Sequence, residues 1–450
     1  MKNYYLMLVL LLIAVAGHAQ SQVLEDYVAE GIENNLTLRQ HDFDVKKSRE
    51  RLNQAKALFL PQISFDASYT RAGGGRNIQF PVGDLLNPVY NTLNQMAGSE
   101  QFPTIENVNE QFLPDDFHDT RVRVIQPLFN TDIYYANKAS EQQLLAEEAR
   151  KDTYVNELEY DIRAAYYTYL QAEEGLKIFQ QSATVLEELV RVNKALVAND
   201  KATYDIIYTA EAELSQMRSQ IIAAQKNVRI ARSYFNFLLN RELEMEIAID
   251  PSVKQDRFVF DNTNQLSADA FASRQELVQV NRAIDASQYL LKLNKNNAYL
   301  PNMNLVLDGG FQGFGYSFDA DQDYWLAQVS LSWNIFKGGE KKSKIRESQY
   351  ELERLNSQYE QLRDQIQLQV INAYNEYLAA NENVEAARAS ELSSGKSFNI
   401  IDKKYRENQV ILVEYLEAQN NYTNARLSRS IAEYNALAKA AELKKVIGNN

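Results

Sequence analysis

Few side chains in this sequence have the types and spacing that catalysis requires. The chain has no cysteine, so thiol nucleophiles, disulfides and cysteine-based metal sites are excluded. Its three histidines, His18, His41 and His118, stand far apart and show no paired metal-ligand spacing. We therefore predict no catalytic residue, no metal site, no bound cofactor and no enzymatic activity.

Two further patterns could suggest chemistry. The glycine-rich run from Gly309 to Gly315 superficially resembles a nucleotide-binding loop, but no helix begins after it, so we interpret it as a turn between strands. A polar series at helical spacing begins at Glu414 and Glu417 and continues through Asn421, Asn424 and Ser428. From the residues alone, this face favours an ordinary solvated surface, with a carboxylate-lined passage as the alternative.

The charge of the chain excludes a further class of function. The sequence has 47 Lys and Arg residues against 60 Asp and Glu residues, which gives a formal charge of −13 at pH 7. Such an acidic chain lacks the basic surface with which proteins bind nucleic acid, so we predict no nucleic-acid partner. Hydrophobic residues make up 45% of the sequence, which argues against a disordered chain.

The first nineteen residues predict an export signal. Lys2 supplies a positive start, Leu6–Val15 is a short apolar core, and Gly17 and Ala19 are small residues at the cleavage positions. We predict cleavage before Gln20, with an uncleaved anchor as the alternative. The apolar core is too short to span a membrane as a helix.

Long stretches without proline and almost without glycine predict long helices. No proline occurs between Pro127 and Pro251 or after Pro301, and Gly175 is the only glycine from 132 to 308. Apolar residues from Leu352 onward recur at steps of three and four, as in a coiled coil. Two long helices are predicted, each about 100 Å long, and each is followed across a turn by a shorter one. The four helices are 133–198, 205–240, 340–406 and 414–446.

Short segments with alternating apolar and polar residues predict four strands. They are 61–71, 119–129, 302–311 and 324–336. Trp325 and Trp333, the only two tryptophans, lie on one face of the last strand, as expected of aromatic residues at two membrane interfaces. The region 72–118 contains three consecutive glycines and four prolines, and we predict an irregular surface loop there.

The chain also repeats itself. Ala57–Pro61 reappears as Asn297–Pro301 at an offset of 240, and Gln126–Phe129 reappears as Trp333–Phe336 at an offset of 207. The difference of 33 residues is an insertion in the loop between the first two strands. The predicted parts are a signal peptide at 1–19, a first repeat at 20–265 that ends in a linker region at 241–265, and a second repeat at 266–450.

Four strands cannot close a barrel, and open sheet edges are not tolerated in lipid. Two copies would give eight strands with a filled interior, whereas three copies give twelve strands, which is enough to enclose a pore. The predicted fold class is an α+β membrane protein whose trimer forms a twelve-stranded β-barrel and a hollow α-helical barrel of long hairpins. The alternative is a soluble protein in which the apolar strand faces meet a core.

Several stretches together resemble the TolC-type outer-membrane efflux protein family. They are Asn34–Leu38, Arg51–Ala55 and Leu60–Pro61, with echoes at Arg274–Leu277 and Leu300–Pro301. The resemblance covers nearly all of the mature chain and implies a homotrimer in the lipid of the outer membrane, with its helical barrel extending into the periplasm. It implies a passive exit duct for drugs or other small solutes, driven by an inner-membrane pump through a periplasmic adaptor protein.

The resemblance also implies roles for residues at the two helical turns. Tyr204 and Asp205 match the family's gate pair, and Glu414 and Glu417 match its narrow acidic ring, which favours a pore-facing position for them. Val410 stands where a basic lock residue is frequent, a role that Lys201 or Arg406 could take instead. Asn199 and Asn408 stand where tip glycines are usual. The surface expected to contact the adaptor consists of Asn199, Asp200, Lys201, Tyr405, Arg406, Asn408 and Gln409.

Two other functions stay open. The same channel could be the exit duct of a type I protein-secretion system. The chemistry of the turns and the neighbouring genes distinguish this function from efflux, whereas the sequence alone barely does. A periplasmic coiled-coil adaptor or scaffold that never enters the membrane is a different class of protein. It would lack the amphipathic strands and would carry a lipidated cysteine or a lipoyl-like β module.

Overall fold

The structure is a computed structural model that describes residues 21–255, 260 and 262–448. It divides into two compact units, and each takes elements from both predicted repeats. The predicted export signal and part of the predicted linker region lie outside the described residues. The first unit comprises the described residues up to Glu50, Glu141–Ala286 and those from Glu351 onward, and the second comprises Arg51–Ser140 and Ser287–Tyr350.

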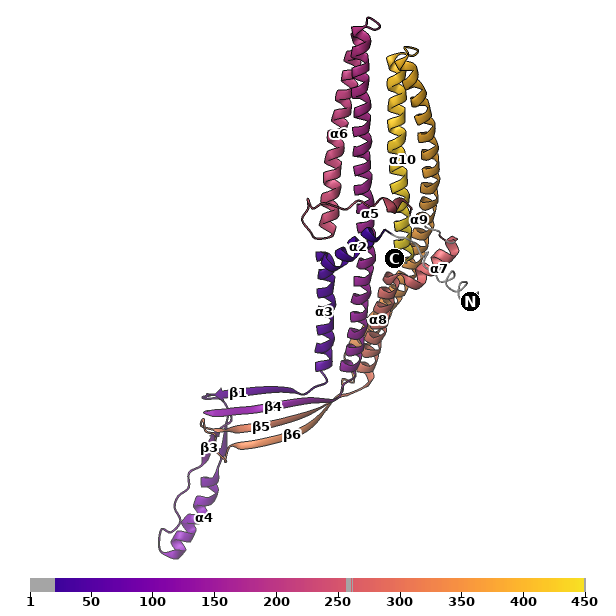
Figure 1. Cartoon of the computed structure of the whole chain (residues 1–450). Coiled ribbons are helices and arrows are strands. Elements are labelled where there is room, and N and C mark those ends of the chain that lie inside the picture. The colour runs from indigo at the N-terminus through magenta and orange to yellow at the C-terminus, as the bar shows by residue number, and fades with distance from the viewer. Residues whose placement is uncertain (1–20, 256–259, 261, 449–450) are drawn as a thin grey trace, which may run out of the picture. The chain divides into compact units, whose positions relative to one another are not determined.

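Two helical hairpins dominate the first unit (Figure 1). α5 (Thr131–Ala198) and α6 (Asp205–Leu238) form one, and α9 (Glu340–Arg406) and α10 (Leu412–Ile447) form the other. α5 has 68 residues and α9 has 67, so each is roughly 100 Å long. Within the described residues, no helix has both the length and the apolar character that crossing a membrane requires.

Each half of the chain has two shorter helices before its first strand. Asn35 and Arg274, which separate the members of each pair, have extended backbones with ψ of 126° and 117°. The side-chain oxygen of Asn35 accepts the N–H groups of Thr37 and Leu38 at 2.9 and 3.0 Å and so caps the second helix. The four helices are α2 (Gln22–Asn34), α3 (Leu36–Ala57), α7 (Thr263–Ser273) and α8 (Gln275–Tyr299), and a short 3-10 helix, η1 (Pro251–Gln255), precedes α7.

The helices of the two halves end in the same way. Asp200 and Asn408 follow α5 and α9 with φ of 51° and 57°. Asn240 and Gly448 follow α6 and α10 with φ of 53° and 70°. Asparagine, aspartate and glycine adopt this left-handed backbone at low cost, so the sequence places a suitable residue at each helix end.

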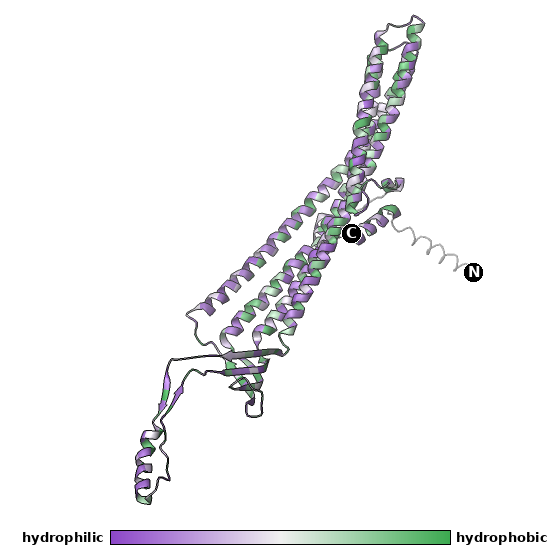
Figure 2. Cartoon of the chain, turned by 90° about the vertical axis from the view of Figure 1, so that its left-hand side faces the viewer, coloured by the Kyte–Doolittle hydropathy of each residue, from purple (hydrophilic) through white to green (hydrophobic). Residues whose placement is uncertain are grey.

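The core of the first unit lies where α2 packs against both helices of the first hairpin. Tyr166 of α5 and Phe235 of α6 are completely buried, and Leu24 of α2 joins them. A Cβ added at Gly31 of α2 would lie 2.3 Å from the Cδ1 atom of Ile162, so a larger residue there would require the Ile162 side chain on α5 to shift. Figure 2 shows hydrophobic and hydrophilic residues mixed along the hairpin helices, as expected of helices with one buried stripe.

The second unit contains a four-stranded antiparallel sheet. Its strands are β1 (Gln62–Thr70), β4 (Phe117–Phe129), β5 (Asn302–Phe314) and β6 (Asp323–Ser332), in the order β1-β4-β5-β6. β1 and β6 are the edge strands, and each has one neighbour in the sheet. Because neighbouring strands alternate in direction, these two edges run in opposite directions.

The two faces of the sheet differ in polarity. On one face Arg123 of β4 stands opposite Asp308 of β5, and its guanidinium donates two hydrogen bonds to that carboxylate at 2.8 and 2.7 Å. The other face carries Phe65, Val122 and Trp325 at matched positions of β1, β4 and β6. These apolar side chains are exposed in the single chain, by 69% for Phe65 and 81% for Trp325. The sheet therefore has an apolar surface that its own chain leaves uncovered.

Two sequence interpretations of these strands are corrected. The run from Gly309 is not a turn as far as Phe314, because β5 continues to that residue. A Cβ added at Gly310 would lie 2.1 Å from the Thr120 carbonyl oxygen, so β5 needs glycine there to pack against β4. β6 ends at Ser332, so Trp333 follows the strand rather than lying within it.

The region 72–118, predicted as an irregular loop, contains regular structure. It holds β2 (Asn77–Phe80), α4 (Val82–Ala97) and β3 (Val108–Gln111), and β2 pairs with β3. The prediction was wrong because it relied on glycine and proline content. Pro81 is the N-cap of α4, where its missing N–H costs nothing, and the helix accommodates Pro88.

Candidate functional site at the helical turns

Both hairpins turn through the same backbone motif. The N–H group of Lys201 donates to a carbonyl oxygen five residues back at 2.9 Å, which leaves Asp200 in the left-handed conformation. The N–H group of Gln409 does the same at 2.8 Å around Asn408. The left-handed residue of the first turn is therefore Asp200 rather than Asn199. Asn199 still donates its N–H to the Ala195 carbonyl as part of the last helical turn.

Tyr405, which the sequence groups with the exposed turn residues, is buried. Its side chain is 5% exposed, and its hydroxyl donates to the side-chain oxygen of Asn193 at 2.7 Å. Asn193 is completely buried on α5 and donates in turn to the Ile206 carbonyl at 2.9 Å. Burial raises the pKa of Tyr405, so the hydroxyl stays protonated and able to donate. The structure thus excludes Tyr405 from a docking surface and makes it a contact between the hairpins.

Arg406 forms a second contact between the hairpins. Its guanidinium lies 3.6 Å from the Glu188 carboxylate of α5 and donates to Asp402 of its own helix at 3.1 Å. Val410 packs against the apolar cluster beneath the turns and carries no charge. Of the two basic residues that could replace a lock at Val410, Arg406 is the one that the structure pairs across the hairpins. Sequence reasoning missed Asn193 and Glu188, although an asparagine within an apolar helical stripe was a usable signal.

The predicted gate residues lie on exposed surfaces of the two shorter helices. Tyr204 is 67% exposed, and α6 begins at Asp205, whose carboxylate accepts a hydrogen bond from the Thr203 hydroxyl. Negative charge in the first turn of a helix is favoured by the helix dipole. Glu414 and Glu417 are both exposed on α10. Their polar series occupies the exposed side of α10, whereas the buried side carries Tyr415, Leu416, Gln419 and Thr423.

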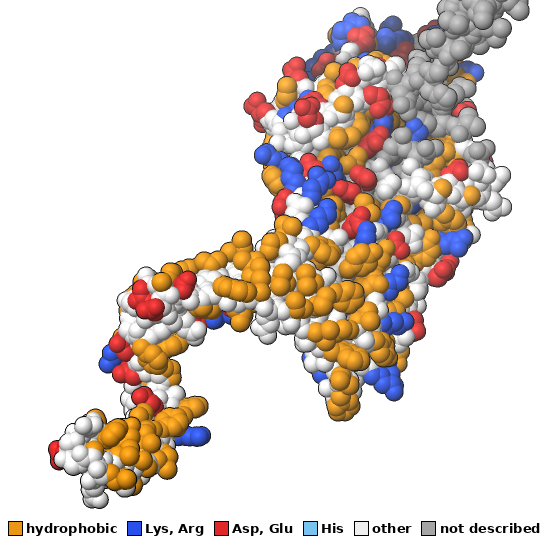
Figure 3. Space-filling model, turned by 90° about the horizontal axis from the view of Figure 1, so that it is seen from below, with side chains coloured by type: hydrophobic (Ala, Val, Ile, Leu, Met, Phe, Trp, Pro, Cys, Tyr) orange, Lys and Arg blue, Asp and Glu red, His pale blue; other side chains and the backbone are white. Residues whose placement is uncertain are grey.

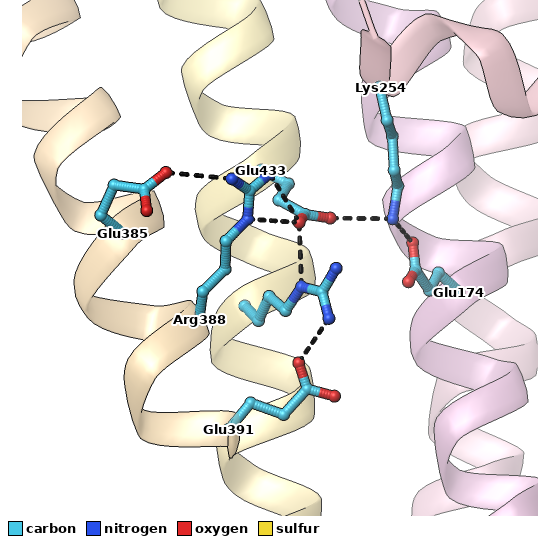
Figure 4. Close-up of polar contacts among 7 residues, drawn as sticks. Glu174, Lys254, Glu385, Arg388, Glu391 and Glu433 are labelled. Carbon is cyan, nitrogen blue, oxygen red and sulfur yellow. Dashed lines mark hydrogen bonds and ion pairs between the residues drawn. The ribbon is translucent and has the colours of Figure 1, made fainter. Parts of the chain in front are cut away.

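A network of seven charged side chains joins the two hairpins farther from the turns (Figure 4). Its centre is Glu433 of α10, which is 7% exposed and contacts Arg429 at 2.9 Å, Lys254 at 3.0 Å and Arg388 at 3.4 Å. Burial alone would raise the pKa of Glu433, but hydrogen bonds from Arg429 and Lys254 outweigh burial and hold this pKa below its ordinary value. Each cation keeps a further carboxylate partner: Glu391 for Arg429, Glu174 for Lys254 and Glu385 for Arg388.

Lys254 is the residue that connects the network to the first hairpin. It lies in η1, within the linker region that ends the first repeat, and it reaches Glu174 of α5 at 2.5 Å as well as Glu433 of α10. The linker region therefore contacts both hairpins through one side chain. The structure holds no group of three or more His, Cys, Asp or Glu side chains arranged for a metal ion among the residues it describes.

Known proteins resemble this chain in sequence and in fold. The sequence model of the family described as "Outer membrane efflux protein" matches residues 266–449. Over 439 residues the chain is 21% identical to the outer membrane protein TolC of Escherichia coli, which covers 92% of this chain and 80% of TolC. The second half of the chain, residues 266–449, belongs to this family, and the chain as a whole is similar to TolC.

Other relatives agree with this membership. The alkaline protease secretion protein AprF of Pseudomonas aeruginosa is 21% identical over 350 residues, with 75% of this chain and 71% of AprF covered. The solved structure of the outer-membrane channel OprN has a TM-score of 0.76 at 16% identity, covering 95% of this chain and 90% of that one. CusC has a TM-score of 0.79 at 15% identity, covering 96% and 93%. These two likenesses show the fold, and the relatives named are channel or secretion proteins rather than enzymes.

Membership of this family assigns the chain to the outer membrane. The uncovered apolar face of the sheet is the surface that has the chemistry to meet lipid. Trp325 and Trp333 are exposed by 81% and 51%. The role of these two tryptophans as interface residues stays a prediction.

Proposed function

We propose that this chain is one protomer of a homotrimeric outer-membrane channel that serves as the passive exit duct of a tripartite efflux system. An inner-membrane pump would drive drugs or other small solutes through it by way of a periplasmic adaptor. The observation that carries the proposal is the sheet, which has four strands, one exposed apolar face and two unpaired edges.

The two unpaired edges of the sheet support the proposed assembly. Unpaired backbone groups cannot face lipid, so β1 and β6 need partners outside the chain. Because β1 and β6 run in opposite directions, β6 of one copy can pair antiparallel with β1 of the next. Three copies close a ring of twelve strands that is wide enough for a pore. The polar face with Arg123 and Asp308 would then line the interior.

The hairpins complete the duct. Helices of about 100 Å have the length to cross the periplasm, with their turns at the far end. The exposed turn residues Asn199, Asp200, Lys201, Asn408 and Gln409 would contact the adaptor, with Arg406 beside them. Where three protomers converge, Glu414 and Glu417 would place six carboxylates around the opening near Tyr204 and Asp205. A ring of like charges in a narrow pore selects cations.

The assembly can be tested with introduced thiols, because the chain has no cysteine of its own. Ser64→Cys on β1 combined with Ser330→Cys on β6 places one thiol on each free edge, both on the polar face. Since the chain does not fix the register between copies, Gln328 and Ser332 serve as alternative β6 positions. Oxidation of one of these pairs should link copies into a ring of three on a denaturing gel.

The matched control moves one thiol to the other face of the same strand. Ala67→Cys with Ser330→Cys should give no linked ring, because the two side chains point to opposite faces. A monomeric mass in mild detergent, together with no linked species from any of the three pairs, would refute the trimer.

A second candidate function is the exit duct of a type I protein-secretion system. The relative AprF, whose name assigns it to alkaline protease secretion, favours this candidate. Deleting the chain distinguishes the two. Hypersensitivity to unrelated toxic compounds with unchanged secreted proteins supports efflux, whereas the loss of one secreted protein with unchanged drug sensitivity supports secretion.

A further inference from the structure

The inserted region between β1 and β4 is a folded module with one face left open. We propose that its helix α4 packs through an apolar stripe against the same helix of neighbouring copies, at the outer mouth of the channel. The inference rests on the trimer proposed above. It concerns a surface, residues 77–113, that the closure of the barrel does not require.

The polar side of α4 is bound to another segment of the module. The side chain of Asn94 accepts the Phe102 N–H at 2.9 Å and donates to the Phe102 carbonyl at 2.8 Å. Asn87 makes the same pair of bonds with Ile105, both at 2.8 Å. Three positions before Asn87, the backbone N–H of Asp84 donates to Asn107 at 3.0 Å. The extended segment 102–107 is therefore fastened along one side of the helix.

The packing on this side is close as well. A Cβ added at Gly83 would lie 2.4 Å from the Ile105 carbonyl oxygen, so the glycine lets segment 102–107 approach the start of α4. The ring of Tyr90 lies 5.4 Å from that of Phe102. Together with the β2–β3 pairing at its base, these contacts give α4 a defined orientation. The module thus presents its opposite face in a fixed way.

That opposite face is apolar and exposed. Leu85, Val89 and Met96 are 69%, 52% and 81% exposed. Their spacing of four and seven places them in one stripe with the partly exposed Leu86 and Leu93, away from Asn87 and Asn94. Hydrophobic side chains gather on this module in Figure 3. The stripe contains no charged residue.

Topology places the modules of neighbouring copies at the same end of the proposed barrel. β1 follows α3 and β4 leads into α5, so the insertion leaves the sheet at the end opposite to the helices. Three protomers in one barrel therefore carry three copies of α4 around one mouth, where tethering gives a high effective concentration. An uncharged stripe can meet its own copy without repulsion.

The negative charge of the module argues against an anionic lipid as the partner of the apolar stripe. The module carries Asp84, Glu100, Glu106 and Glu110, and the sequence has no lysine or arginine from residue 77 to residue 120. It therefore offers no cation to a phosphate headgroup. A second copy, which is always present in the trimer, needs no such cation.

The absence of native cysteine again permits a direct test. In intact cells that express the full chain, Met96→Cys is treated with a short membrane-impermeant bis-maleimide, and Leu85→Cys provides a second stripe position. Asn91→Cys is the matched control, because Asn91 is exposed on the polar side of the same helix. The stripe variants should give covalent dimers of the chain that the control lacks. Adding Val89→Glu to Met96→Cys should reduce the linked fraction, because it places a charge in the stripe.

Each outcome decides the proposal. A thiol at Met96 that reacts with a monofunctional maleimide but yields no linked chain, while the trimer persists in mild detergent, overturns the packing of α4 and leaves the proposed channel intact. Linkage of Met96→Cys only to a different protein also overturns it. A chain that is monomeric in detergent and unlinked at both β1–β6 and α4 positions overturns the channel and this inference together.

Discussion

Replacing Glu433 by glutamine removes the one carboxylate that contacts all three cations of the network between the hairpins. The substitution keeps the shape of the side chain and takes away its charge. Lys254, Arg388 and Arg429 would each lose one partner and keep another, on Glu174, Glu385 and Glu391. The loss in stability is therefore smaller than the loss that follows when a buried charge is left without any partner.

The exposed fractions of the four side chains set the size of the expected loss in stability. Glu433 is 7% exposed, whereas Lys254, Arg429 and Arg388 are 29%, 42% and 46% exposed. Breaking a fully buried pair costs roughly 3–5 kcal/mol and breaking an exposed pair at most about 1 kcal/mol. Glu433→Gln falls between these limits, so we expect it to lower the free energy of unfolding of the helical unit by about 2 kcal/mol.

The control comes from the same network. Glu385 is 74% exposed and pairs with Arg388 alone at 3.0 Å, so Glu385→Gln should cost about 0.5 kcal/mol or less. Urea unfolding in mild detergent, followed by helical circular dichroism, compares the two variants. Equal losses from Glu433→Gln and Glu385→Gln would refute the reasoning, because burial would then make no difference.

The pH dependence of stability follows from the same carboxylate. The folded-state pKa of Glu433 lies below its ordinary value of 4.5. The stabilisation is therefore fully present above that value and is lost as the pH falls through the folded-state pKa. Between neutral pH and pH 3 the difference in stability between wild type and Glu433→Gln should shrink. A difference that stays constant over this range would contradict the linkage.

Three further predictions concern the turns. Asp200→Val should lower stability by about 1–2 kcal/mol in urea unfolding, because valine disfavours positive φ, whereas Asn199→Val should leave the stability unchanged. Tyr405→Phe should cost about 1 kcal/mol and raise the open probability in planar bilayers, and an unchanged open probability would show that this hydroxyl does not hold the hairpins together. The double variant Glu414→Gln, Glu417→Gln should weaken cation selectivity and divalent block in the same recordings. Wild-type values for both would place these residues on a solvated surface outside the constriction.

Local patterns were enough to predict the elements that depend on local physics. Stretches without proline and glycine predicted the helices observed at Thr131–Ala198 and Glu340–Arg406. Alternation predicted the four strands of the sheet, including the one observed at Phe117–Phe129. Arg121 and Arg123 occupy the polar face, and the register shifts between Pro127 and Phe129.

Features that depend on distant contacts could not be predicted in this way. The helix α4 is held in place by hydrogen bonds from Asn87 and Asn94 to residues 18 and 8 positions away. Composition does not reveal these contacts, so the glycine and proline content of the region predicted a loop. Tyr405 was predicted at an exposed turn because nothing near it in the sequence reveals Asn193, which lies 212 positions earlier. The tip residue was wrong by one position, since the last turn of α5 extends through Asn199 before Asp200 reverses the chain.

The contacts between the hairpins are graded along their length, and the gradation bears on how a gate could open. Near the turns, one hydrogen bond joins Tyr405 to Asn193 and one exposed ion pair joins Arg406 to Glu188. These polar contacts are worth about 1–2 kcal/mol in each protomer. Farther along, the Glu433 network joins the same hairpins.

Opening the turns would break these polar contacts, which three protomers would release together for roughly 3–6 kcal/mol. It would also disturb the buried apolar cluster beneath the turns, to which Leu412 and Tyr415 belong. A partner that binds the open turns more tightly than the closed ones by the sum of these costs would shift the equilibrium to the open state. The exposed residues Asp200, Lys201, Asn408 and Gln409 lie beside these contacts, so a partner docked on them would act directly on the contacts that opening must break.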